Sequence, residues 1–143
     1  MSSVLILHIL AAFVWLGCVL TETVFERVGD GSEVIRRFIA EAHWRIDVFV
    51  EIPAFVVVAL TGAYMAAVLP SSPGIMIMMT AGLIAVGISV YCTYLVRERL
   101  RAAEAGEASL WFELDHQLHR CGAVVLIGVL VALSAGVSLF VAG

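Results

Sequence analysis

Charged side chains are scarce in this chain. They make up 14% of its 143 residues, whereas 62% of the residues are hydrophobic and the mean hydropathy is +1.06. This composition leaves too few polar side chains to cover one water-soluble core. The sequence also lacks a glycine-rich phosphate loop, a basic stripe and an accessible Ser/His/Asp arrangement. These absences argue against soluble-enzyme chemistry and a nucleic-acid partner, and they predict a protein whose main partner is the lipid bilayer.

Four apolar stretches are long enough to cross a hydrocarbon layer of about 30 Å, which takes roughly 20 helical residues. They run over residues 4–23, 48–69, 74–96 and 121–142. No repeat or low-complexity linker divides the chain, so we expect a single domain over residues 1–143. Glu22 and Glu26 stand where a signal peptide would have its small-residue cleavage site, so we expect the first stretch to be retained. The fold predicted is an all-α integral membrane four-helix bundle.

Lysine is absent, and the eight basic residues are all arginines. Four of them flank the first connection and four flank the third: Arg27, Arg36, Arg37, Arg45, Arg97, Arg99, Arg101 and Arg120. Because short arginine-rich loops stay in the cytoplasm, we expect both connections to be cytoplasmic and both termini to be non-cytoplasmic. The middle connection, residues 70–74, contains two prolines and a glycine and predicts a tight turn. We expect the membrane to be a bacterial inner membrane.

Acidic and histidine side chains gather where three of the expected helices leave the membrane. Groups of this kind at a bilayer edge need partners, and a metal ion can satisfy several of them at once. Carboxylate and imidazole ligands together suit iron, manganese or zinc, and the set is large enough for two ions bridged by carboxylates. We therefore expect a dinuclear site, with iron first and zinc, manganese or copper as alternatives. The expected metal ligands are Glu22, Glu26, His43, Asp47, Glu51, His116 and His119.

The second expected helix carries three of these ligands at four-residue steps. His43, Asp47 and Glu51 therefore share one face, which turns by about 40° at each step. Glu51 lies among apolar residues, where an unpaired carboxylate costs about 2.5 kcal/mol or more near the bilayer centre. Pro53 follows it and removes a helix hydrogen bond, so we expect a local distortion that opens space beside the cluster.

The last expected helix begins with His116 and His119, which are three residues apart on one face. Asp115 falls near that face, so we expect it to orient the histidines by hydrogen bonding. Tyr91 and Tyr94 of the third helix are expected at a similar depth, where they would hydrogen-bond a ligand or line a substrate path.

Several functions fit this pattern. The first is redox chemistry on oxygen or on a small or lipid-soluble substrate, because a site with open coordination positions serves an oxidoreductase. A metal transporter, chaperone or sensor is the second, and a b-type haem electron carrier that uses His43 and His119 is the third. A structural subunit, in which the acids form ordinary salt bridges with arginines, also stays open.

Cysteine and glycine add two further alternatives. Free cysteines in membrane spans usually behave as small apolar residues, although Cys18 and Cys121 as soft ligands would favour copper or zinc. The many glycines and alanines of the spans allow close helix packing, and they make a homodimer possible.

The segment from Leu7 to Gly17, LHILAAFVWLG, resembles the first helix of the CopD-like copper-resistance proteins and of the HemJ-type haem-pathway oxidases. The resemblance covers about a dozen residues and includes a histidine seven residues before a tryptophan. In those families the corresponding histidine is linked to copper or haem, and this implication transfers to His8 alone. The acid-rich stretches at residues 22–26 and 43–51 depart from both family patterns.

Overall fold

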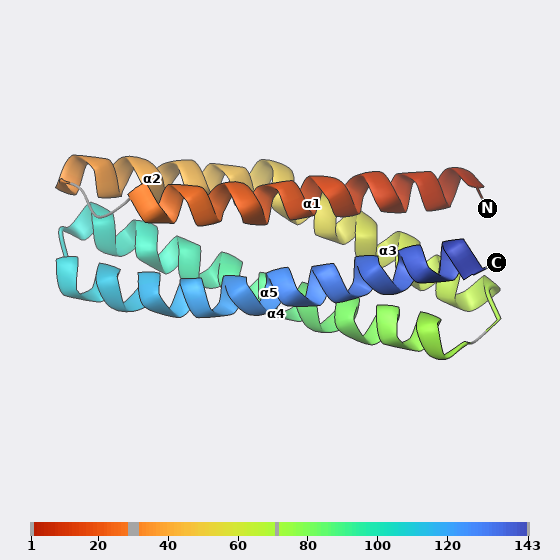
Figure 1. Ribbon diagram of the computed structural model, residues 1–143. Coiled ribbons are helices and arrows are strands. Elements are labelled where there is room, and N and C mark those ends of the chain that lie inside the picture. Colours follow the sequence, from red (N-terminus) through yellow and green to blue (C-terminus); the bar gives the residue numbers. More distant parts are fainter. Residues whose placement is uncertain (1, 29–31, 71, 143) are drawn as a thin grey trace.

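The computed structural model describes residues 2–28, 32–70 and 72–142, and within these ranges every element is a helix. The elements are α1 (Ser2–Val28), α2 (Glu33–Ile46), the π-helix η1 (Asp47–Glu51), α3 (Ile52–Val68), α4 (Pro73–Ala105) and α5 (Ala108–Ala142). Because α2, η1 and α3 follow without a break, the chain forms four long helical segments packed side by side (Figure 1). The prediction of an all-helical bundle is confirmed.

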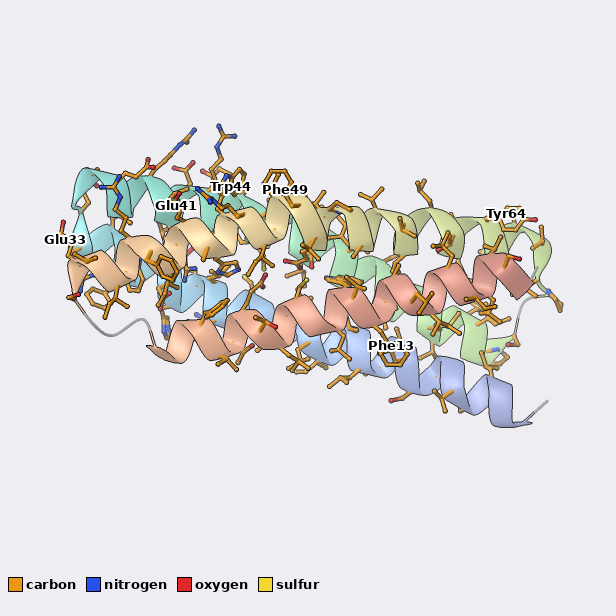
Figure 2. The ribbon with its side chains drawn as sticks, turned by 90° about the horizontal axis from the view of Figure 1, so that it is seen from above. Phe13, Glu33, Glu41, Trp44, Phe49 and Tyr64 are labelled. Carbon is orange, nitrogen blue, oxygen red and sulfur yellow. The ribbon has the colours of Figure 1, made fainter. Side chains whose placement is uncertain are left out.

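Four helical segments are long and apolar enough to cross a membrane: Ser3–Phe25, Glu33–Val68, Pro73–Ala105 and Ala108–Leu139. Large apolar side chains cover the outside of the bundle. Phe49 is 75% exposed and Tyr64 is 52% exposed, and both point away from the helices (Figure 2). A surface of exposed apolar side chains is costly in water and is favourable in lipid. The helical backbone is also suited to lipid, because each helix satisfies its own backbone hydrogen bonds. Length and composition thus indicate an integral membrane protein.

Both chain termini and the α3–α4 connection lie at one end of the bundle, and the other two connections lie at the opposite end (Figure 1). We call the latter the arginine-bearing end. After the α3–α4 connection, Ser72 caps α4 by accepting a hydrogen bond from the Ile75 amide at 3.3 Å, and Pro73 occupies the first turn of the helix. At the opposite end, Gly106 reverses the chain between α4 and α5 with a φ of 72°.

The helices continue well beyond the four expected spans at the arginine-bearing end. At 1.5 Å per residue the 33 residues of α4 extend about 50 Å, against about 30 Å of hydrocarbon. The helix α2 begins at Glu33, well before His43 of the second expected helix, and α5 begins at Ala108, before His116 of the last expected helix. The physical reason is amphipathicity: α2 buries Ile39, Ala40 and His43 in the bundle and exposes its charged face.

The helices α4 and α5 approach each other closely in the bundle core. A Cβ atom added at Gly128 would lie 3.1 Å from the Cβ of Ala85 and 3.3 Å from the carbonyl oxygen of Ala81. Ala85 is itself fully buried in the cluster around Trp15 and Val125. Small residues at such a crossing let the two backbones approach, which is the usual basis of helix packing in membranes.

We predict that Gly128→Leu destabilises the fold by about 1–3 kcal/mol, because its side chain has no space between α4 and α5. Thermal unfolding in mild detergent measures the effect. The matched control is Gly87→Leu, since Gly87 is exposed on α4 and a Cβ there meets nothing within 4 Å. Equal melting temperatures for the two variants would contradict the close approach.

Candidate metal centre

A π-helical turn shapes the middle of the second segment. In η1 the amide of Ile52 donates to the carbonyl of Asp47, five residues back, instead of the four of an α-helix. Pro53, which has no amide hydrogen to continue the ladder, follows directly. The distortion expected at the proline therefore takes the form of a widened turn upstream of it. On a regular α-helix, each four-residue step would rotate the side chain by about 40° around the helix axis. The wider π-helical turn offsets this rotation, so that Asp47 and Glu51 are buried in the bundle like His43.

Four ionisable side chains meet inside the bundle: Glu22 from α1, His43 from α2, and Asp47 and Glu51 from η1 are all buried. The Nε2 atom of His43 lies 3.2 Å from Oε2 of Glu22 and 3.5 Å from Oδ1 of Asp47. One potential ligand atom from each of Glu22, His43 and Asp47 lies within 4.8 Å of the others. The carboxyl groups of Glu22 and Glu51 both lie beside that of Asp47. We call these four residues the buried cluster.

A cavity of about 30 Å³ opens among these groups. Its polar lining consists of Glu22, Thr23, His43, Asp47, Glu51, Ser89 and Cys92, and its apolar lining includes Val19, Leu118 and Val125. A single water molecule needs about 10–15 Å³ of such space, so the cavity has room for one ion together with one or two water molecules. The hydroxyl oxygen of Ser89 is buried and has no hydrogen-bond partner among the described residues. It is therefore a donor atom that a bound ion or water would satisfy.

A buried arginine joins the cluster from α4. Arg99 is 0% exposed. Its Nη2 donates to Nδ1 of His43 at 2.6 Å, and its Nη1 donates to Oδ1 of Asp115 on α5 at 2.5 Å. The guanidinium also lies 5.7 Å from the centroid of the Trp111 ring. On the opposite side of the cluster, the indole N–H of Trp15 donates to Oε1 of Glu51 at 3.0 Å.

The buried cluster concentrates carboxyl groups. Three carboxyl groups lie side by side in a medium of low dielectric constant, and Arg99 already serves Asp115 as well as His43. Neighbouring buried carboxylates repel strongly, and each would cost several kcal/mol unless it is paired or protonated. A bound cation or retained protons would relieve this repulsion.

The structure brings together four of the seven expected ligands and leaves the two histidines of α5 outside. His116 and His119 are exposed, and the side chain of His119 is 42% exposed. The Nδ1 atom of His119 lies 2.8 Å from the carbonyl oxygen of Asp115 in the same helix. Asp115 lies beside His119 as expected, with 3.4 Å between Oδ2 and Nδ1, but its stronger partner is Arg99. The side chain of Glu26 lies outside the described part of the chain.

The two tyrosines of α4 are also placed away from the cavity. Tyr91 and Tyr94 are exposed, and their rings stack on each other with centroids 6.4 Å apart. The side of α4 that faces the cavity carries Ser89 and Cys92 instead. Sequence reasoning chose the tyrosines for their depth in the membrane, but depth does not specify which side of a helix faces the bundle.

Sequence reasoning did not include Arg99 or Trp15 among the residues of the site. A usable signal for Arg99 exists, because the buried positions 95, 96, 99 and 102 of α4 follow a helical repeat that includes it. Trp15 does pack against Phe55 in the core, with ring centroids 6.0 Å apart, and its indole N–H also reaches Glu51. Trp15 therefore donates a hydrogen bond to a carboxyl group of the buried cluster, and Arg99 donates one to its imidazole.

Comparisons with protein-family models, with curated proteins and with solved structures found no match to this chain. The resemblance of the first helix to the CopD-like and HemJ-type families therefore stays a prediction. Its one transferable residue, His8, lies apart from the buried cluster, and its Nδ1 is 2.8 Å from the hydroxyl oxygen of Thr61 on α3.

We predict that Trp15→Phe destabilises the protein by about 1–3 kcal/mol, because Glu51 loses a buried donor. Trp111→Phe is the matched control: both tryptophans are 2% exposed, but the indole nitrogen of Trp111 has no hydrogen-bond partner among the described residues. Its replacement keeps an aromatic face toward Arg99 and should cost less. Thermal unfolding of both variants in detergent tests this order, and the reverse order would contradict the role of Trp15.

Proposed function

We propose that this chain is an integral membrane metalloprotein that holds one metal ion in the cavity of the buried cluster. The main support is that three buried carboxyl groups and an imidazole surround a cavity of about 30 Å³. The buried hydroxyl of Ser89 also lines this cavity and has no hydrogen-bond partner among the described residues. A divalent cation offsets the charge of the carboxylates and supplies Ser89 with a partner.

The proposal is narrower than the dinuclear site expected from the sequence. A second ion needs further ligands, and the candidates for them were Glu26, His116 and His119. Both histidines are exposed, and neither lines the cavity. Glu22, Asp47 and Glu51, with His43 beside them, form one set of groups around a single cavity, which favours one ion.

Redox chemistry is the activity that we propose for the bound ion. Iron or manganese among carboxylates can exchange electrons with oxygen or with a lipid-soluble substrate. The protein's own residues supply the surroundings: Trp15 and Arg99 hold Glu51 and His43 in place, and apolar side chains from α1 and α5 keep bulk water away. The arginine bias places the cluster toward the cytoplasmic side, in a bacterial inner membrane in this proposal.

Two features bear on the other functions considered. A haem would need His43 and His119 on two sides of one cavity, but His43 is buried at the cluster whereas His119 is exposed on α5. Ion handling keeps one supporting observation, because His8 and Thr61 form a second polar contact between α1 and α3, toward the end that carries the termini. In a transporter, His8 and Thr61 would form a second binding position for the ion. Transport is therefore the alternative function that we retain.

Metal content tests the proposed site. Purified in mild detergent, the wild-type protein should carry about one iron or manganese ion per chain by mass spectrometry, because the cluster offers one set of ligands. Asp47→Asn and Glu22→Gln should lose most of it, since each removes a ligand charge from the cavity. The controls are Glu41→Gln, an exposed acid paired with Arg45 on the same helix, and His119→Ala; both should keep the metal.

Two results would count against this site. Loss of metal in His119→Ala would indicate that the histidines of α5 bind the metal after all. Folded wild-type protein without metal after expression in iron- and manganese-replete medium would leave the carboxyl groups to bind protons. In that case uptake of Mn²⁺ or protons by vesicles that contain the protein would decide whether the cluster serves transport.

A further inference from the structure

The contact between Arg99 and His43 determines which nitrogen of the imidazole carries hydrogen. A guanidinium group has donors only, so Nδ1 of His43, at 2.6 Å from Nη2 of Arg99, must accept. A neutral ring with an accepting Nδ1 carries its hydrogen on Nε2. That Nε2 atom lies 3.2 Å from Oε2 of Glu22 and 3.5 Å from Oδ1 of Asp47, so its N–H points at the carboxylates.

An imidazole in this tautomer cannot bind a cation through Nε2. Coordination needs the lone pair of that nitrogen, so the hydrogen would have to move to Nδ1, where Arg99 donates. Arg99 is itself confined: it is fully buried, bound to Asp115 and stacked near Trp111. The ring therefore presents a hydrogen-bond donor to the ligands of the ion and no nitrogen to the ion itself.

We infer that Arg99 is a positioning residue that fixes the tautomer of His43 and thereby restricts the site to cations that prefer oxygen ligands, such as Mn²⁺. The inference rests on the proposed metal site and specifies its ligands. Glu22, Asp47 and Glu51 supply carboxylate oxygens, Ser89 supplies a hydroxyl, and His43 holds two of the carboxylates in place. Carboxylate and hydroxyl oxygens suit Mn²⁺, whereas Zn²⁺ and Cu²⁺ gain more from an imidazole nitrogen.

The first experiment determines which ring nitrogen of His43 carries hydrogen, and it needs no metal. In protein labelled with ¹⁵N-histidine, the ring nitrogens of the metal-free wild type are observed by NMR, and His43 is assigned by comparison with His43→Gln. Protonated and unprotonated imidazole nitrogens have well-separated shifts. We expect hydrogen on Nε2 and an accepting Nδ1, and hydrogen on Nδ1 would overturn the inference.

The second experiment measures the selectivity of the site between Mn²⁺ and Zn²⁺. Dissociation constants for Mn²⁺ and Zn²⁺ are measured in the wild type, in Arg99→Met and in Arg97→Met. Arg97 is the matched control, because it is exposed on the same helix and lies over Trp44, at 5.9 Å from the ring centroid. Without Arg99 the hydrogen can move to Nδ1, so the preference for Zn²⁺ over Mn²⁺ should rise by about 10–100-fold in Arg99→Met. It should stay unchanged in Arg97→Met.

The outcomes separate this inference from the proposed function. A folded Arg99→Met that binds both ions with the wild-type preference overturns the role of Arg99 and leaves the metal site standing. Binding of neither ion by the wild type overturns the metal site and the selectivity together. If Arg99→Met does not fold, the nitrogen shifts of the wild type still support or overturn the tautomer.

Discussion

Carboxyl groups inside an apolar bundle must be compensated by their neighbours, and most of the polar structure of this protein does that. Glu51 takes the indole N–H of Trp15, and Glu22 and Asp47 face the imidazole of His43. His43 is in turn held by Arg99, which is held by Asp115. Each of the four long helical segments contributes at least one member of this chain of contacts. Removing one partner leaves a buried charge exposed to an apolar medium, which is the costly case for buried ionic groups.

The π-helical turn is the backbone feature that makes the arrangement possible. Three ionisable residues at four-residue steps on a regular α-helix would rotate progressively away from one partner helix. The widened turn at Asp47–Glu51 brings both acids to the inner face together with His43, and Phe49 points outward between them (Figure 2). Turns of this type occur frequently at functional sites, because they place a side chain where a regular helix cannot.

The fold and part of the site were predictable from the sequence for different reasons. Hydropathy alone predicts four long helices, because a spanning segment needs a long apolar run, and the structure confirms the all-helical bundle. His43, Asp47 and Glu51 were predictable because ionisable groups near apolar runs must face inward. His116 and His119 fall at the same level but lie on an exposed face of α5, so the level of a residue in the membrane did not predict its orientation. Arg99 was counted only among the arginines that flank a connection, since its burial depends on how the helices pack.

The choice of arginine at position 99 follows from its geometry. A lysine could neutralise one acceptor as a point charge, but the planar guanidinium donates from Nη1 to Asp115 on α5 and from Nη2 to His43 on α2 at the same time. It thus links two helices that are distant in the sequence. Since an arginine cannot act as an acceptor, the imidazole next to it has one permitted tautomer. The orientation of a single buried side chain on α4 thereby decides which nitrogen of His43 carries the hydrogen that faces Glu22 and Asp47.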